Sequence, residues 1–159
     1  LVLRQRECIA AGAALVAERR VGRGRRSAGS PEATTQVWLG DSMGEMAAYY
    51  AMADLAFIGG SLLPLGGQNL IEAAACGCPV LVGPHTFNFT QATEDAIAAG
   101  AAKRVLDFDA LAQQVRVLFS APDQLVGMRE SAANFAAAHR GATAKTVALI
   151  ERALGQAGR

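Results

Sequence analysis

The sequence predicts an α/β fold in which helices cover both faces of a parallel β-sheet. Short apolar runs alternate with stretches of helical spacing through residues 1–106, and this alternation favours right-handed βαβ units. The stretch 53–84 shows the pattern most clearly, as a strand, a glycine-rich loop, a short helix and a second strand. Because the chain has 159 residues, we expect one domain spanning 1–159 that ends in a helical segment.

The first 52 residues are predicted to alternate between extended and helical segments. Residues 1–3 are expected to end a strand, and 4–20 have helical spacing. The Gly-, Arg- and Ser-rich stretch 21–31 predicts a turn or a short exposed strand, and 36–39 predicts another strand. Ser42 and Glu45 have the spacing of a capping box, which predicts a helix that starts there and runs to about residue 52.

The rest of the chain is predicted to continue the alternation and then to become helical. Residues 53–58 read as a strand, 69–76 as a helix, 79–82 as a strand and 85–89 as a loop. A helix over 90–100 is expected to end at Gly100, and a short strand follows at 102–106. Three helices are then predicted, at 109–120, 122–139 and 142–154.

Composition indicates a globular protein with an uneven charge distribution. Hydrophobic residues make up 52% of the chain and charged residues 18%, with a formal net charge of +1. Residues 1–30 nevertheless carry seven arginines: Arg4, Arg6, Arg19, Arg20, Arg23, Arg25 and Arg26. These arginines form either a solvated surface or a basic face for RNA, anionic lipid or phosphate. No apolar stretch approaches the ~20 residues that span a bilayer.

Three loops are expected to meet at one edge of the sheet. Residues 40–45, 59–69 and 83–89 all follow predicted strands, and ligands of parallel sheets bind beyond the carboxyl ends of the strands. Gly66 and Gly67 allow close approach of a ligand, and Asn69 opens a helix whose free N–H groups favour a phosphate. Asn69 and Glu72 are equally well explained as a helix cap without any ligand.

The segment His85-Thr86-Phe87-Asn88-Phe89 has two further interpretations. His85 is a candidate phosphate donor or pH-sensitive group. Alternatively, the histidine lies against its own loop and both phenylalanines plug the core. The three cysteines, Cys8, Cys76 and Cys78, suggest neither a disulfide framework nor a zinc site.

Several of these stretches together resemble one enzyme family. WLGDSMGEM, DLAFIGGSL, GGQNLIEAAACGCPVLVGP and HTFNF are similar to the C-terminal half of the 3-deoxy-D-manno-octulosonic acid (Kdo) transferases of lipid A biosynthesis, over about residues 34–154. The resemblance implies the Rossmann-like C-terminal domain of a GT-B glycosyltransferase, which binds the donor CMP-Kdo. It implies no cofactor and no metal.

The resemblance also assigns residues. The family's nucleotide-contacting segments fall on two groups of positions in this sequence: Gly44, Glu45 and Met46, and Asn69, Leu70, Ile71 and Glu72. Further donor contacts are expected from Ser42, Gly66, Gly67 and Gln68. The family's Arg-His-Pro segment is missing, and Arg4 or Arg6 stands roughly in its place.

The resemblance places the remaining functions elsewhere. No catalytic residue is expected in this chain, because the family's glutamate base, its site for the lipid A precursor and its membrane-associating surface belong to an N-terminal domain. The chain is therefore expected to be inactive alone, and the full-length protein to work at the cytoplasmic face of the bacterial inner membrane, without nucleic acid. Two alternatives stay open: a UDP-sugar glycosyltransferase or nucleotide-sugar epimerase, and a non-catalytic module whose arginines bind RNA or another anion.

Overall fold

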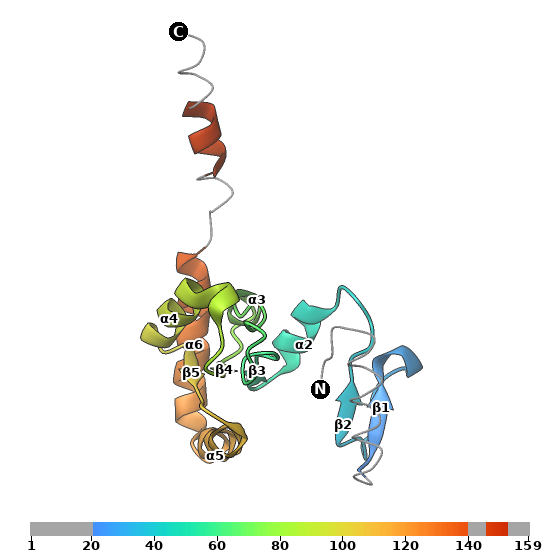
Figure 1. The fold of residues 1–159 in the computed structure, drawn as a ribbon. Helices are drawn as coiled ribbons and strands as arrows, with labels where there is room; N and C mark the ends of the chain where they lie inside the picture. Colours follow the sequence, from blue (N-terminus) through green and yellow to red (C-terminus); the bar gives the residue numbers. More distant parts are fainter. Residues whose placement is uncertain (1–20, 140–145, 153–159) are drawn as a thin grey trace. The chain divides into compact units, whose positions relative to one another are not determined.

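The computed structural model describes residues 21–139 and 146–152, and these residues divide into two compact units (Figure 1). Unit 1 comprises residues 1–49 and unit 2 residues 50–159. The organisation as one domain stays a prediction. The expected strand at 1–3 and helix at 4–20 lie outside the described residues.

Unit 1 contains a pair of parallel strands. Strand β1 (Arg23–Arg25) pairs with β2 (Val37–Leu39), in a register that aligns Arg25 with Leu39. The 3-10 helix η1 (Arg26–Ala28) begins the connection between them. Helix α2 (Met46–Met52) follows β2 and crosses into the range of unit 2. The strand predicted at 36–39 and the helix ending at residue 52 are therefore confirmed.

Unit 2 contains a three-stranded parallel sheet of order β3-β4-β5. Its strands are β3 (Ala56–Phe57), β4 (Val80–Val82) and β5 (Ala102–Arg104). Helix α3 (Ile71–Ala75) connects the first two strands, and η2 (Phe87–Phe89) with α4 (Thr90–Ala98) connects the next two. Consecutive parallel strands joined through helices are the βαβ pattern that the sequence predicts.

The buried strand β4 explains how helices cover both faces of this sheet. Val80 and Val82 pack into a core with residues of α3, α4 and α6 (Pro122–Ala138). Leu81 points the other way and packs with Leu118 of α5 (Phe108–Phe119) and Met128 of α6. Because side chains alternate along a strand, one apolar run supplies both cores.

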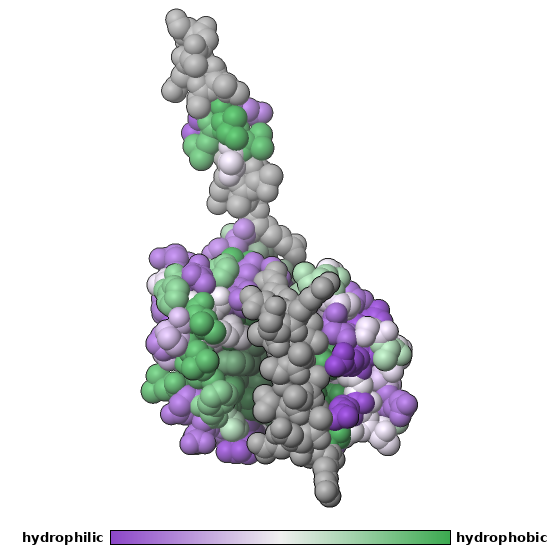
Figure 2. All heavy atoms as spheres, turned by 45° about the vertical axis from the view of Figure 1, so that its right-hand side comes forward, coloured by the Kyte–Doolittle hydropathy of each residue, from purple (hydrophilic) through white to green (hydrophobic). Residues whose placement is uncertain are grey.

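The ends of the helices follow the local sequence signals. The Asp107 carboxylate accepts a hydrogen bond of 2.7 Å from the Ala110 N–H and caps α5. Gly100 has a φ of +76°, which lets the chain leave α4 with Ala101 N bonded to Ala96 O at 2.9 Å. Residues 146–152 are helical as predicted, with Val147, Leu149 and Ile150 exposed; they form the largely green segment between two grey ones in Figure 2.

Candidate functional site

The two loops that follow β3 and β4 are joined through one buried serine. The Ser61 hydroxyl donates to Ile58 O at 2.5 Å and accepts from Gly83 N at 2.8 Å, while Ser61 O accepts from His85 N at 2.9 Å. Ser61 is fully buried, and a Cβ added at Gly83 would lie 2.2 Å from Ser61 O. The loops 59–69 and 83–89 therefore meet at the carboxyl ends of neighbouring parallel strands.

The glycines of the first loop serve the contact with the second loop. Gly66 has a φ of +85°, and its O accepts from Asn88 N at 3.2 Å. A Cβ at Gly66 would lie 2.3 Å from Asn88 Nδ2 and 2.7 Å from Phe87 Cε2. Glycine is required here by the backbone conformation and by the protein's own side chains. On this side of Gly66, the place expected for a ligand is filled by Asn88 and Phe87.

The start of α3 is held by a reciprocal pair of side chains. Asn69 Oδ1 accepts from Ile71 N at 3.0 Å, and Asn69 Nδ2 donates to Glu72 Oε1 at 3.2 Å. Asn69 thus satisfies one N–H at the start of α3, as the capping interpretation predicts, but the N-cap residue is Leu70, which makes no side-chain cap bond, and Glu72 binds the Asn69 side chain. This arrangement leaves the half-buried Glu72 carboxylate able to accept further hydrogen bonds, because each ionised oxygen has two acceptor positions.

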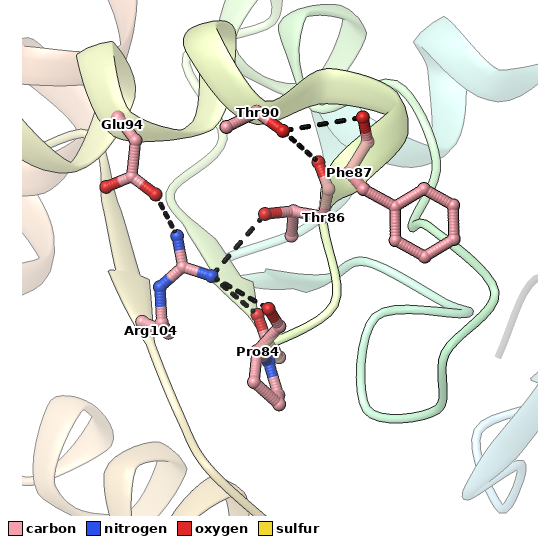
Figure 3. A network of polar contacts seen from close by, with 7 residues as sticks. Pro84, Thr86, Phe87, Thr90, Glu94 and Arg104 are labelled. Atoms are coloured by element: carbon pink, nitrogen blue, oxygen red, sulfur yellow. Dashed lines mark hydrogen bonds and ion pairs between the residues drawn. The ribbon is translucent and has the colours of Figure 1, made fainter.

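Arg104, at the end of β5, fixes the loop after β4 (Figure 3). Its Nη1 donates to Gly83 O at 3.2 Å, to Pro84 O at 3.4 Å and to Thr86 Oγ1 at 3.4 Å. Its Nη2 pairs with the Glu94 carboxylate of α4 at 2.5 Å. The guanidinium thus ties three consecutive elements together at the carboxyl edge of the sheet.

The two phenylalanines of this loop do not share one role. Phe89 packs against the core, as the core-plug interpretation predicts. Phe87 is 62% exposed, and its ring points away from Arg104 in Figure 3, so that interpretation is wrong for Phe87. The Thr90 hydroxyl donates to Phe87 O at 3.4 Å and to Thr86 O at 3.5 Å, which fixes the backbone beneath the exposed ring.

Unit 1 holds Glu45 between an arginine and a serine. Arg26 donates to Glu45 Oε1 from Nε at 3.1 Å and from Nη2 at 2.8 Å, and the Ser42 hydroxyl donates to Oε2. The Tyr49 hydroxyl lies 3.3 Å from Ser42 Oγ. The hydrogen bond from Ser42 and the guanidinium of Arg26 hold the pKa of Glu45 below its ordinary value.

This network replaces the predicted capping box. In a capping box each side chain binds a backbone N–H, but here the Ser42 and Glu45 side chains bind each other. Helix α2 begins at Met46, and Glu45 O accepts from Ala48 N at 3.0 Å, so Glu45 stands at the helix entrance. The prediction is therefore correct about the place where the helix begins and wrong about the partners of both side chains.

The carboxylate of Asp41, four residues before Glu45, is also held by hydrogen bonds. Its carboxylate accepts from Ser27 N at 2.9 Å and from the Ser27 hydroxyl at 2.7 Å. These two hydrogen bonds lower its pKa, with a smaller effect from Arg25 at 3.8 Å. Arg25 and Arg26 therefore each have a carboxylate partner, and their side chains remain 53% and 41% exposed. Arg4, Arg6, Arg19 and Arg20 lie outside the described residues.

The structure brings together only part of the predicted site. Residues 66–72 and 85–88 lie together in unit 2, whereas Ser42, Gly44, Glu45 and Met46 belong to unit 1. The meeting of all three loops in one crevice stays a prediction. Among residues 21–139 and 146–152, no three His, Cys, Asp or Glu side chains are grouped as a metal site, and no helix is long and apolar enough to cross a bilayer.

Sequence reasoning missed Ser61, Arg104 and Arg26, each of which makes contacts far along the chain. Ser61 looks like one more polar residue of a glycine loop, and Arg104 like a strand residue. Arg26 is one of seven similar arginines. The one available signal was topological: Arg26 follows β1, its partner Glu45 follows the loop after β2, and the carboxyl ends of parallel strands lie at the same edge of a sheet.

Comparison with known proteins points to one family, although no family model matches the sequence. A 3-deoxy-D-manno-octulosonic acid transferase of Bordetella pertussis is 53% identical over 133 residues, which are 82% of this chain and 31% of that protein. The transferase of Haemophilus influenzae is 52% identical over 61 residues, 38% of this chain and 14% of that protein. The chain thus spans at most about a third of these relatives.

A solved structure extends the similarity to the fold. The crystal structure of the C-terminal CMP-Kdo binding domain of WaaA from Acinetobacter baumannii matches with a TM-score of 0.77 and 30% identity. The match covers 83% of this chain and 69% of that one. Together with the parallel sheets and their helices, it confirms the predicted α/β class and the C-terminal half of a GT-B fold. The chain belongs to the 3-deoxy-D-manno-octulosonic acid transferase family.

Proposed function

We propose that this chain binds the donor CMP-Kdo for a Kdo transferase that adds Kdo to a lipid A precursor in lipopolysaccharide biosynthesis. One observation carries the proposal: the CMP-Kdo binding domain of WaaA from Acinetobacter baumannii has the same fold at 30% identity over 83% of this chain. The bond that breaks joins Kdo to the CMP phosphate, and the bond that forms joins Kdo to an acceptor hydroxyl, with inversion at the sugar carbon. CMP leaves.

The proposed nucleotide site consists of two segments: Gly44, Glu45 and Met46, and Asn69, Leu70, Ile71 and Glu72. Glu72 suits the ribose hydroxyls, because its half-buried carboxylate accepts one hydrogen bond from Asn69 and has room for more. Glu45 is the second carboxylate, held by Arg26 and Ser42. Ser42, Gly66, Gly67 and Gln68 are proposed to line the donor.

The proposed contact between the start of α3 and the departing phosphate requires the Asn69 side chain to move. Ile71 N, at the start of α3, is bonded to Asn69 Oδ1 at 3.0 Å. It can donate to the departing phosphate only when the Asn69 side chain turns toward the ligand, where its amide can itself donate. Stabilising the departing CMP by such donors is the chemical contribution proposed for this chain.

We place the other steps in the part of the relatives that this chain does not cover. The base, the site for the lipid A precursor and the surface that meets the cytoplasmic face of the inner membrane belong there in this proposal. This chain by itself then binds CMP-Kdo but does not transfer Kdo.

Calorimetric titration tests the donor preference. CMP is titrated into the chain beside UMP and UDP, at concentrations up to millimolar. We expect heat of binding with CMP and at least about tenfold weaker binding of UMP, because the two bases exchange donor and acceptor positions at one edge. Saturation by UDP and not by CMP would instead favour a UDP-sugar glycosyltransferase or an epimerase. Binding of RNA that fell steeply with salt would favour the anion-binding module.

Substitution of Glu72 separates the ribose role from capping. Glu72→Gln keeps a side-chain oxygen that can accept from Asn69 but removes the charge, whereas Glu72→Ala removes both. If Glu72 contacts the ribose, both variants weaken CMP binding while the chain stays folded by circular dichroism. If the carboxylate serves α3 alone, Glu72→Gln binds CMP as the parent does, and Glu72→Ala lowers only the melting temperature.

A further inference from the structure

Arg26 and Glu45 come from different elements of unit 1 and meet at the carboxyl edge of its strands. Arg26 follows β1 directly and begins η1, and Glu45 immediately precedes α2. Arg26 Nε and Nη2 both donate to Glu45 Oε1, at 3.1 and 2.8 Å, and Ser42 donates to Oε2. Both oxygens of the carboxylate therefore have a partner, Oε1 in Arg26 and Oε2 in Ser42, and its orientation is fixed.

The contacts of Arg26 and Ser42 with Glu45 contribute more to the orientation of its carboxylate than to the stability of the fold. The Arg26 and Glu45 side chains are 41% and 31% exposed, and ion pairs with this much solvent contact contribute little to folding. An arginine with two donors on one oxygen, together with a serine on the other, restricts the carboxylate to one geometry. Such restriction matters where a carboxylate must meet a ligand in a defined direction.

We infer that Arg26 is a positioning residue that acts through Glu45, holding this carboxylate in the orientation in which it meets the nucleotide. The inference rests on the proposed function and adds a residue that the family resemblance does not assign. The surroundings support it: Arg26 and Ser42 contact Glu45, Tyr49 contacts Ser42, and the carboxylate of nearby Asp41 has its own partners, Ser27 and Arg25. The hydrogen bond from Ser42 and the guanidinium of Arg26 lower the pKa of Glu45, which favours its ionised form.

A double-mutant cycle on CMP affinity tests the inference. The dissociation constant of CMP is measured by calorimetry for the parent, Arg26→Ala, Glu45→Ala and the double variant, with melting temperatures in parallel. Arg26→Ala is expected to weaken binding by about three- to tenfold. In the Glu45→Ala background the same change should alter affinity by less than about twofold, because the side chain through which Arg26 acts is already lost.

Two further variants make the test specific. Arg26→Lys keeps the charge but offers no second donor in the fork geometry, so it should recover only part of the affinity. Arg23→Ala removes an exposed arginine from β1, the strand that directly precedes Arg26, and should leave affinity and melting temperature unchanged.

Each of the following outcomes would overturn the inference, and the measurements distinguish them from one another. If Arg26→Ala weakens binding equally in both backgrounds, Arg26 contacts the ligand directly. If it weakens binding only in proportion to a fall in melting temperature, the ion pair is structural. If the parent binds CMP and Arg26→Ala does not change its affinity, Arg26 has no positioning role. If the parent itself does not bind CMP, the proposed function fails, and this inference fails with it.

Discussion

The serine that joins the two loops of unit 2 gives the sharpest stability prediction. Ser61→Ala deletes one hydroxyl, which donates to Ile58 O at 2.5 Å and accepts from Gly83 N at 2.8 Å. Ser61 is fully buried, so water does not replace the lost partner. The substitution therefore leaves the N–H of Gly83 and one acceptor position of Ile58 O unsatisfied in the interior.

The expected loss of stability follows from these two unsatisfied groups, the Gly83 N–H and Ile58 O. A buried polar group that loses its partner costs about 1–3 kcal/mol, and the donor is the more expensive of the two here because an N–H has only one hydrogen to give. We therefore expect the free energy of unfolding to fall by about 2–4 kcal/mol. For a chain of this size that corresponds to a fall in melting temperature of about 5–15 °C.

Urea unfolding followed by circular dichroism measures this change directly. The midpoint should fall while the slope with urea concentration stays the same, because the surface exposed on unfolding does not change. Ser120→Ala, at an exposed serine after α5, is the matched control and should stay within about 0.5 kcal/mol of the parent. A similarly small effect of Ser61→Ala would refute the claim that this hydroxyl joins the loops.

Three further predictions concern other contacts. Arg104→Ala should destabilise the chain by about 1–3 kcal/mol in urea unfolding, and Glu94→Gln by less than about 1 kcal/mol, because the contacts of Arg104 to the loop remain; equal losses would contradict the anchoring role. Thr93→Val should raise stability by about 1 kcal/mol, because Thr93 Oγ1 is buried without a partner among the described residues; a loss of that size would show that the hydroxyl is used. Asp41 and Glu45 have lowered folded-state pKa values, so their stabilisation is present above their ordinary values of 3.8 and 4.5 and is lost as pH falls through the folded-state values. The melting temperature should therefore fall below about pH 4.5, and less so in Glu45→Gln; identical pH profiles would contradict the assignment.

The sequence predicted the order of elements well because periodicity is a local property. The apolar run at Val80–Val82 and the helical spacing of 109–120 both lie within a few turns of chain. The end of α4 at Gly100 was also predictable, because a left-handed residue after a helix requires glycine. Boundaries shifted by one or two residues, as at α3, which begins at Ile71 and not at Asn69.

The partners of polar side chains were not predictable in the same way. The spacing of Ser42 and Glu45 indicated a capping box, but Arg26, 19 residues earlier, occupies the carboxylate. Gly66 was expected to allow close approach of a ligand, and on its Cβ side the structure places Asn88 and Phe87 of the neighbouring loop. In both cases the deciding contact comes from a distant part of the chain, and no local pattern encodes it.

Mapping CMP onto the chain by NMR tests the central proposal most directly. Backbone amide resonances of the labelled chain are followed while CMP is added to saturation, with UMP as the control. The proposal predicts shifts concentrated at residues 42–46 and 69–72, and weaker shifts with UMP. Unchanged spectra at millimolar CMP, or shifts confined to residues outside these two segments, would contradict it.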